Sequence, residues 1–373
     1  MKEISSKDYY NRVFGSWLGR VAGDFVGVPV EGRPYELILE KYGDITDFPE
    51  PIDLNHVNDD EMYEIVALLA MEKFGINITS QQIGQEWLNL LSREDNIFTA
   101  EIIAYNNLKA GILPPQSGIL NNFYYDFIGA QMRADIWGQI TPGCPEIAKE
   151  YAEIDGCVSH AGVGIEGEVY LAVLISQAFF EPDIKKNIET ALKYLPKKED
   201  SLYTQTVLKA IDLYENNKTD FRVARQTLIK DYWLKELVSK VVSSSLVFQR
   251  DFVRRIVLNT GMGMIHTLPN IGIIILSLLY GAQDKDDPFG RSVCIAAMMG
   301  YDTDCNCGNI GALMGAELGV DKIPEKWKDP LQDTFSTFVK RNEKWKISEL
   351  SRRIANIGEK VIKDKGKNIV RIT

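Results

Sequence analysis

The sequence contains few histidines and cysteines, and this scarcity excludes some kinds of protein. Only 3 of its 373 residues are histidine and 5 are cysteine. An odd number of cysteines without a repeated spacing does not predict a disulfide framework, so we expect reduced thiols and a cytoplasmic protein. The Cys305-x-Cys307 pair has a single intervening residue, shorter than the gap typical of zinc loops. The sequence therefore does not favour a structural zinc site.

Excess positive charge and long apolar runs are also missing. The chain has 52 acidic and 42 basic residues, with a formal net charge of −10 and a sequence pI near 5.1. A broad acidic surface does not suit a polyphosphate backbone, so we expect no nucleic-acid partner. The longest apolar run, 271–280, is well short of the roughly 20 residues that a membrane helix needs, and residues 1–10 lack an apolar signal-peptide core. We therefore expect a soluble protein without a membrane partner.

Helical periodicity, by contrast, is present along nearly the whole chain. No segment alternates with period two for long enough to predict a strand, and the 45% of hydrophobic residues are enough for a large core. The sequence thus predicts an all-α fold, with a single compact multi-helix domain over 1–325 and a C-terminal helical appendage over 326–373. The expected helices are 10–28, 61–71, 77–92, 101–109, 169–180, 271–280, 289–299 and 309–318, with further amphipathic helices in 181–255 and two after residue 326.

The first expected helix carries a stripe of glycines. They occur at every fourth position, at Gly15, Gly19, Gly23 and Gly27. Each glycine costs about 1 kcal/mol relative to alanine inside a helix, so the stripe requires the close approach of another backbone or of a ligand. A tight helix crossing is the simpler interpretation. Pro29 then ends the helix, and we expect Glu31 at the edge of whatever packs against the stripe.

Two acidic motifs each precede or begin an expected helix. The first is Asn58-Asp59-Asp60, for which helix capping by Asn58, with Glu61 completing a capping box, is one interpretation. Metal ligation is the alternative, because two adjacent carboxylates repel each other unless a cation offsets their charge.

The second motif is Gly300-Tyr-Asp-Thr-Asp-Cys-Asn-Cys-Gly308, between two apolar segments. Its donors are mainly hard oxygens, which suit magnesium or manganese, apart from the thiol of Cys305. If the two helix starts converge, their carboxylates could hold two cations.

Two shorter segments also combine small and polar residues. Gly129-Ala130-Gln131-Met132-Arg133 is not the pattern of a plain amphipathic helix, and Ser159-His160 stands before a glycine-broken segment. A lone histidine at such a junction is more often a structural residue than a catalytic one.

Together these motifs resemble the ADP-ribosylglycohydrolase family, in a divergent branch with an Asp-Thr-Asp-Cys-Asn motif. Order and spacing agree over roughly residues 10–325. The matching pieces are Gly15-x-x-x-Gly19-x-x-x-Gly23-Asp24, Gly27-x-Pro29-x-Glu31-Gly32, Asp59-Asp60, Gly129-Ala130-Gln131-Met132-Arg133, Ser159-His160 and Asp302-Thr303-Asp304.

The resemblance implies a central metal-binding cleft with two magnesium ions, or manganese in their place. The implied metal ligands are Asn58, Asp59, Asp60, Asp302, Asp304 and Cys305. The implied catalytic carboxylates are Glu31, Asp60 and Asp304, with Asp304 as the bridging ligand and Glu31 at the metal edge. The implied substrate-binding residues are Gly129, Ala130, Gln131, Met132 and His160.

The implied function is magnesium-dependent hydrolysis of the glycosidic bond in an ADP-ribosylated protein side chain or an ADP-ribose conjugate. Two departures from the family pattern keep alternatives open, because Asn58 and Cys305 stand where the family usually has hydroxyl residues. An asparagine carbonyl can replace a hydroxyl, whereas a thiol suits magnesium poorly. Cys305 therefore either weakens one metal position or leaves that position to water or to Asn306. The alternatives are a hydrolase of another ribosylated small molecule and a non-catalytic, crystallin-like relative.

Overall fold

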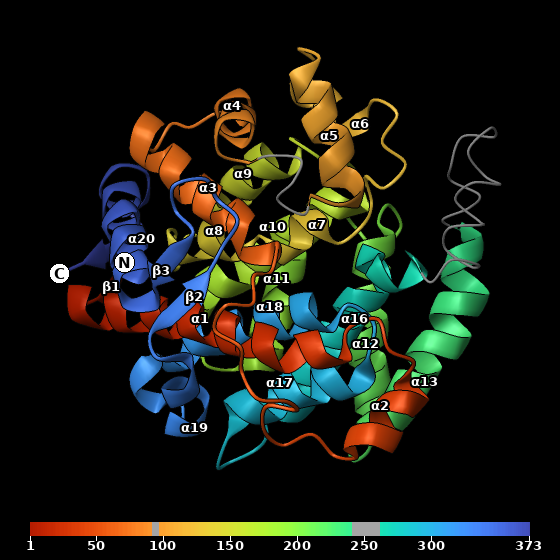
Figure 1. The fold of residues 1–373 in the computed structure, drawn as a ribbon. Coiled ribbons are helices and arrows are strands. Elements are labelled where there is room, and N and C mark those ends of the chain that lie inside the picture. The colour runs from red at the N-terminus through yellow and green to blue at the C-terminus, as the bar shows by residue number, and fades with distance from the viewer. Residues whose placement is uncertain (92–96, 241–261) are drawn as a thin grey trace.

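The computed structural model describes residues 1–91, 97–240 and 262–373, and these residues are mostly helical (Figure 1). The helices are α1 Ser6–Gly27, α2 Tyr35–Tyr42, α3 Asp60–Phe74, α4 Ser80–Leu90, α5 Thr99–Lys109, α6 Gln116–Ile119, α7 Gly129–Met132, α8 Asp135–Gln139, α9 Pro145–Gly156, α10 Val163–Ala178, α11 Ile184–Ala191, α12 Leu202–Asn216, α13 Phe221–Gln226, α16 Thr267–Gly281, α17 Pro288–Met299, α18 Thr303–Leu318, α19 Glu325–Lys328 and α20 Ile347–Val361. Two π-helical stretches cover Thr227–Leu237 and Ile362–Gly366, and the strands are β1 Lys2–Ile4, β2 Thr334–Ser336, β3 Lys344–Lys346 and β4 Val370–Ile372. The all-α prediction is confirmed. Ser92, the predicted end of one helix, and residues 241–255 lie outside the described residues.

The crossing of α1 and α18 forms the centre of the fold. The glycine stripe of α1 faces α18, where a Cβ atom built on Gly19 would lie 2.1 Å from the carbonyl oxygen of Gly311. A Cβ atom on Gly23 would lie 2.1 Å from the carbonyl oxygen of Cys307. Gly311 and Gly315 of α18 meet the backbone of α1 in the same way. The two backbones are therefore in direct contact, which confirms the tight helix crossing.

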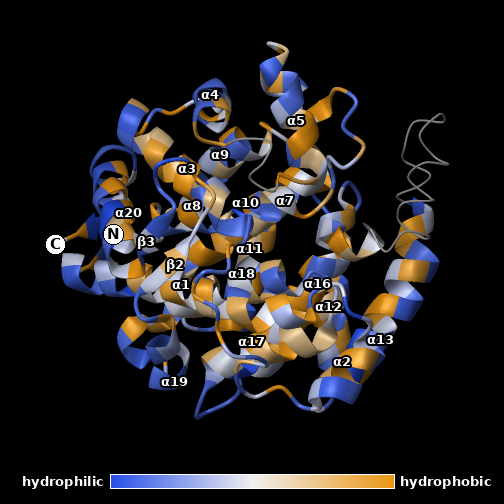
Figure 2. Cartoon of the chain, in the orientation of Figure 1, coloured by the Kyte–Doolittle hydropathy of each residue, from blue (hydrophilic) through white to orange (hydrophobic). Residues whose placement is uncertain are grey.

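Apolar helices surround this crossing. α10, α16 and α17 pack against α18, and nearly every residue of α10 and α16 is buried. A helix that is apolar on all sides is typical of a core position. Figure 2 shows the apolar residues gathered on the central helices, whereas outer helices such as α5 also carry polar faces. None of the helices in the described ranges is long and apolar enough to cross a lipid bilayer.

The end of the chain differs from the two helices predicted after residue 326. Residues 334–346 form an antiparallel hairpin of β2 and β3, in which the buried Phe335 and Trp345 are cross-strand partners. Such aromatic pairs stabilise a hairpin, and a helical period does not reveal them. The long helical segment of this region is α20 with its π-helical extension, and α20 packs on α1. Its predicted apolar stripe is buried, at Ile347, Leu350, Ile354, Ile357, Val361 and Ile362.

The two termini meet beside α1. β4 pairs in parallel with β1, with Lys2 opposite Val370 and Ile4 opposite Ile372. Figure 1 shows both chain ends at the same edge of the molecule. The last segment is thus anchored to the first, and α20 shares the common hydrophobic core.

Candidate metal centre and pocket

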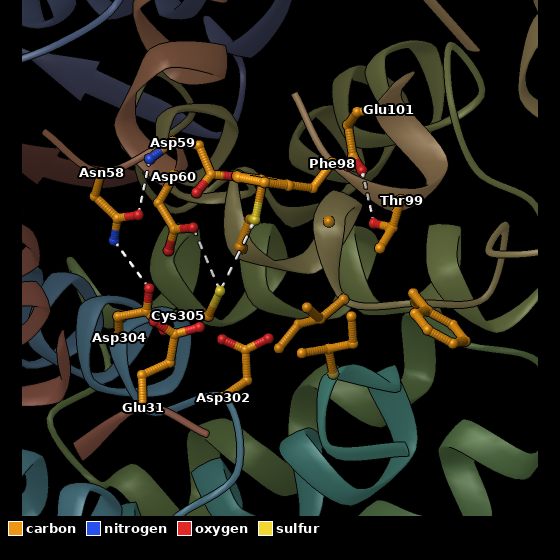
Figure 3. A pocket seen from close by; sticks show the side chains of 15 residues that line it. Glu31, Asn58, Asp59, Asp60, Phe98, Thr99, Glu101, Asp302, Asp304 and Cys305 are labelled. Carbon is orange, nitrogen blue, oxygen red and sulfur yellow. Dashed lines mark hydrogen bonds between the residues drawn. The ribbon is translucent and has the colours of Figure 1, made fainter. Parts of the chain in front are cut away.

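A pocket of about 370 Å³ opens where the two acidic motifs meet (Figure 3). Its lining residues come from α3, α5, α7 and α18 and from nearby loops. They are Glu31, Asn58, Asp59, Asp60, Phe98, Thr99, Glu101, Phe127, Ile128, Gly129, Met132, Ile265, Asp302, Asp304 and Cys305. All of the predicted metal-ligand residues therefore converge on one cavity. Among the described lining residues there is no lysine or arginine, so the pocket wall is strongly acidic.

The α1–α18 crossing brings Glu31 to the second motif. The hydroxyl of Thr303 donates to the carbonyl oxygen of Gly27 at 2.8 Å, and the backbone N–H of Gly32 donates to the carbonyl oxygen of Tyr301 at 3.2 Å. Tyr301 has a φ of 75°. This left-handed conformation is unfavourable for a bulky residue and turns the chain sharply just before Asp302.

Arg20 of α1 forms a buried ion pair with the first motif. Its guanidinium is 1% exposed and lies 3.0 Å from Asp60 Oδ2 and 2.9 Å from Asp135 Oδ2. A third carboxylate, that of Glu61, lies 3.5 Å away. The sequence interpretation missed Arg20, although a charged residue between Leu18 and Val21 on the glycine helix was an available signal.

The first motif does not cap α3 in the predicted way. α3 begins at Asp60, and Asp59 precedes it without a capping hydrogen bond from its side chain in the described structure. The Oδ1 atom of Asn58 accepts from the N–H of the adjacent Asp59 at 2.8 Å. Its Nδ2 atom donates to Asp24 and, at 3.0 Å, to Asp304 Oδ2. The capping-box interpretation is therefore wrong, because the amide of Asn58 is used to link two carboxylates of other helices.

Two groups of side chains in the pocket have donor atoms close enough to share a cation. One group is Asp60, Asp304 and Cys305, and the other is Glu31, Asp302 and Asp304. Within each group the donor atoms lie within 4.8 Å of one another, and Asp304 belongs to both. The Oδ1 atom of Asp304 is buried and has no hydrogen-bond partner among the described residues. A buried oxygen without a partner and its carboxylate neighbours form a set that fits a divalent cation.

The raised pKa values of these carboxyl groups show that burial and mutual repulsion disfavour their ionised forms. Burial, followed by the charge of Asp304, raises the pKa of Asp302 well above its usual range. The charge of Asp304 and partial burial raise the pKa of Glu31 to about 7. Burial is also the main cause that raises the pKa values of Asp59 and Asp60. A bound cation would favour the ionised carboxylates and reverse these shifts.

The predicted substrate-binding residues lie in different places. Gly129 and Met132 line the pocket. Ala130, Gln131 and His160 are buried and are absent from its described lining. Gln131 accepts a hydrogen bond from the Tyr203 hydroxyl at 2.8 Å.

His160 lies behind the pocket wall. Its Nδ1 atom is 2.7 Å from the Ser159 hydroxyl, and its Nε2 atom is 3.7 Å from Glu101 Oε1. Burial, followed by the charge of Arg133, lowers the pKa of His160 well below its usual range. The imidazole is therefore neutral, and it contacts a residue that does line the pocket.

That residue, Glu101, is one the sequence interpretation missed. Its Oε1 atom accepts from Arg133 Nη1 at 3.1 Å, and a Cβ atom on Gly129 would lie 1.8 Å from the same oxygen. Burial, opposed by the charge of Arg133, raises the pKa of Glu101 to about 7. In Figure 3, Glu101 and Thr99 lie away from the acidic cluster of Asp302 and Asp304. The sequence offered no clear signal, because an acid in the first turn of a helix is common.

The fold and the site define an all-α protein with a central acidic pocket suited to divalent cations. The model of the ADP-ribosylglycohydrolase family matches residues 5–361, and the chain belongs to this family. It is 26% identical, over 324 residues, to an uncharacterized protein of Archaeoglobus fulgidus, covering 85% of this chain and 90% of that protein. A solved structure described as an ADP-ribosylglycohydrolase-related protein complex superimposes with a TM-score of 0.55 at 16% identity, covering 94% of this chain and 99% of the other.

Membership of this family makes the chain a glycosidase that acts on ADP-ribosyl-related substrates. Its members generally use divalent metals, and the acidic pocket is consistent with that use. The family match therefore favours the prediction of an enzyme over the alternative of a non-catalytic, crystallin-like relative.

Proposed function

We propose that this chain is a magnesium-dependent hydrolase that cleaves the bond between the anomeric carbon of ADP-ribose and an attached protein side chain or small conjugate. The observation that carries the proposal is the position of Asp304, which is shared by two groups of close donor atoms and keeps one buried oxygen without a partner. A carboxylate that belongs to both groups can hold two cations close together, as in a two-metal hydrolytic site.

The residues that would hold two magnesium ions are Asp59, Asp60, Asp302 and Asp304, with Asn58 and Cys305 at the edges of the set. Asn58 presents its amide nitrogen to Asp304, and a rotation of its amide group would be needed to offer its oxygen to a cation. When bound, the ions would supply positive charge to the ribose hydroxyls and to a water molecule. Manganese has similar ligand preferences and is a second candidate.

Glu31 is the best placed residue to accept the proton of the attacking water. It lies at the open edge of the pocket beside Asp302 and Asp304. With magnesium bound beside it, Glu31 would be ionised, and an ionised carboxylate at this position can accept a proton. The water would add to the anomeric carbon, the glycosidic bond would break, and the leaving group would take up a proton. Asp60 and Asp304 remain candidates for assisting these proton transfers.

The acidic lining of the pocket also supports a role for a bound cation in substrate binding. A diphosphate brought near six carboxylates would be repelled, because no lysine or arginine lies among the described lining residues. The apolar side chains of Phe127, Ile128 and Ile265 offer a second kind of surface on the same pocket. A sugar has both hydroxyls for cations and apolar carbons for such a surface.

The test is the release of ADP-ribose from three substrates, ADP-ribosyl-arginine, ADP-ribosyl-serine and O-acetyl-ADP-ribose, with magnesium and with EDTA. We expect turnover of at least one substrate, dependent on magnesium. Glu31→Gln should lower kcat by about a hundredfold or more, as expected for loss of a general base. Glu40→Gln on the exposed face of α2 is the matched control and should keep full activity.

Absence of turnover with all three substrates, in protein that still binds magnesium, would favour the alternative of another ribosylated small molecule. Equal turnover with EDTA would refute magnesium dependence.

A further inference from the structure

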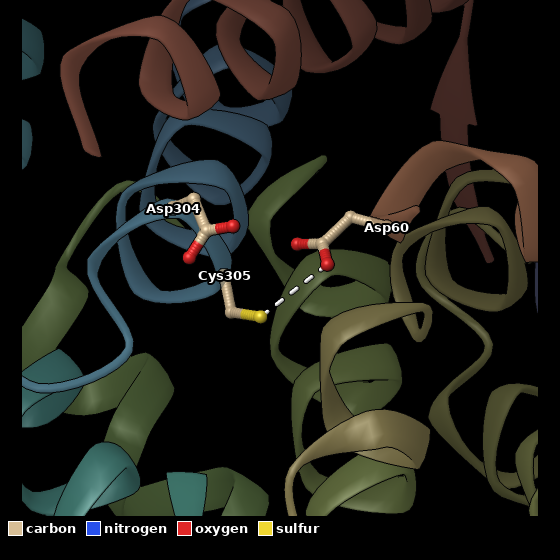
Figure 4. A group of neighbouring side chains, drawn as sticks. All are labelled: Asp60, Asp304 and Cys305. Atoms are coloured by element: carbon tan, nitrogen blue, oxygen red, sulfur yellow. Dashed lines mark hydrogen bonds between the residues drawn. The ribbon is translucent and has the colours of Figure 1, made fainter. Parts of the chain in front are cut away.

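One of the two donor groups in the pocket contains sulfur as well as oxygen. Cys305, in the first turn of α18, is 4% exposed and lines the cavity. Its Sγ atom lies 3.4 Å from Asp60 Oδ1 and 3.9 Å from the Sδ atom of Met132. Figure 4 shows Asp60, Asp304 and Cys305 directed toward a common space. This group therefore combines a thiol and a nearby thioether with two carboxylates.

The other donor group has a different chemistry. It consists of Glu31, Asp302 and Asp304, and its donor atoms are all carboxylate oxygens. Asp304 belongs to both groups, and its buried Oδ1 atom has no hydrogen-bond partner among the described residues. The two groups thus share one carboxylate but differ in the softness of their remaining donors.

The surroundings of Cys305 also differ from those of other buried cysteines. The thiol of Cys307 donates to the carbonyl oxygen of Val293 and lies on the α17 side of the helix. Cys294 is buried within α17. Cys305, in contrast, faces two carboxylates at the wall of a cavity, which is an unfavourable place for a thiol that serves only to fill the core.

We propose that the two cation positions are not equivalent and that the position at Asp60, Asp304 and Cys305 selects a borderline cation such as Co²⁺ or Zn²⁺ over Mg²⁺. Sulfur ligands favour softer cations, whereas a set of oxygens alone suits magnesium. On binding, the Cys305 S–H bond would break, the proton would leave to solvent, and the thiolate would bind the cation. The inference rests on the metal site of the proposed function, but it concerns the choice of cation and not the substrate.

The test uses Co²⁺ as a probe in the absence of any substrate. Titration of the metal-free protein with Co²⁺ should produce a thiolate-to-cobalt charge-transfer band in the near ultraviolet. Cys305→Ser should lack this band, lower Co²⁺ affinity by about tenfold or more, and keep its thermal stabilisation by Mg²⁺. Cys157→Ser is the matched control, because this half-buried thiol does not line the pocket, and it should keep the band.

A second measurement on the unaltered protein covers the case in which Cys305→Ser does not fold. Alkylation of Cys305 by iodoacetamide, followed by mass spectrometry, should be slowed several-fold by Zn²⁺ or Co²⁺ and much less by Mg²⁺. Cobalt binding without a charge-transfer band, or equal protection by all three cations, would overturn the inference. The proposed function fails on a different result, namely the absence of magnesium-dependent hydrolysis.

Discussion

At the scale of single residues, the carboxyl groups of the pocket lie closer together than their charges favour. Burial, followed by the charge of Asp304, raises the pKa of both Asp302 and Asp59. Uncompensated charges of this kind oppose folding. A cation that binds only the folded protein removes the repulsion and adds its binding free energy to stability.

The variant Asp302→Asn tests this balance. Removing one carboxylate relieves repulsion, so the metal-free variant should melt at the same temperature as the unaltered protein or a few degrees above it. The same change removes a ligand, so the increase in Tm on adding magnesium should be largely lost. The measurement is thermal unfolding at neutral pH with EDTA and with magnesium.

Asp321→Asn, at an exposed position in the turn after α18, is the control for removal of one negative charge. It should show the full magnesium effect. If Asp302→Asn gains as much in Tm from magnesium as the control does, Asp302 is not a ligand.

At the scale of elements, the α1–α18 crossing both holds the core together and assembles the site. Gly27 at the end of α1 lies against Thr303 at the start of α18, and a Cβ atom on Gly27 would be 2.3 Å from the carbonyl oxygen of Thr303. Arg20, which is also in α1, forms an ion pair with Asp60 of α3. The distance between the two helix axes therefore sets the distance between the carboxylates.

The variant Gly19→Ala should separate these helices. The added methyl group would meet the Gly311 backbone, which cannot move as a flexible side chain can. We expect a loss of about 3 kcal/mol in the free energy of unfolding, together with a smaller increase in Tm on adding magnesium, because the two acidic motifs move apart. Chemical denaturation and thermal unfolding with magnesium are the measurements.

Gly84→Ala is the matched control within a helix. A Cβ atom there would meet only side-chain atoms of Leu108 and Pro114. Its cost should be below that of Gly19→Ala, and magnesium should stabilise it normally. Equal effects of the two substitutions would mean that the backbone contact of α1 and α18 has no special importance.

At the scale of the whole molecule, the pocket links stability to pH. In the metal-free protein the pKa values of Glu31 and Glu101 are raised to about 7, from an ordinary value of 4.5. A carboxyl group with a raised pKa in the folded state stabilises the protein fully below its unfolded pKa, and this contribution is lost as the pH rises through the folded pKa. The free energy of unfolding should therefore decrease between about pH 4.5 and pH 7.

Magnesium should oppose this decrease, because it favours the ionised carboxylates. We expect the increase in Tm on adding magnesium to be larger at about pH 8 than at about pH 5. Thermal unfolding across this range, with EDTA and with magnesium, is the measurement. The variant Glu101→Gln should show a shallower pH dependence when metal-free, and an increase that is the same at both pH values would contradict the linkage.

Several features of the fold and the site could be predicted from sequence because they depend on neighbouring residues. Helical periods located most helices, and the spacing of Gly15 to Gly27 indicated a close crossing. The residue types at Asp59, Asp60, Asp302 and Asp304 indicated a hard cation. Their convergence into one pocket was implied by the family resemblance, and spacing did not reveal it.

Other features could not be predicted because they depend on contacts across the chain. The amide of Asn58 is oriented by Asp24 and Asp304, and the cross-strand pair of Phe335 and Trp345 appears only when the chain turns back. Glu101 enters the pocket because Gly129 leaves it room.

By itself, the sequence determined the all-α class, the bare glycine face of α1 and the acidic chemistry of the site, since these follow from composition and period. Which charged side chains lie close together was decided only by the tertiary structure. The thiol of Cys305 lies 3.4 Å from an oxygen of Asp60, a residue 245 positions away in the chain. The physical reason is that this contact joins α18 to α3: α1 packs against α18, and its Arg20 forms an ion pair with Asp60 of α3, so the contact depends on three helices that are far apart in the chain.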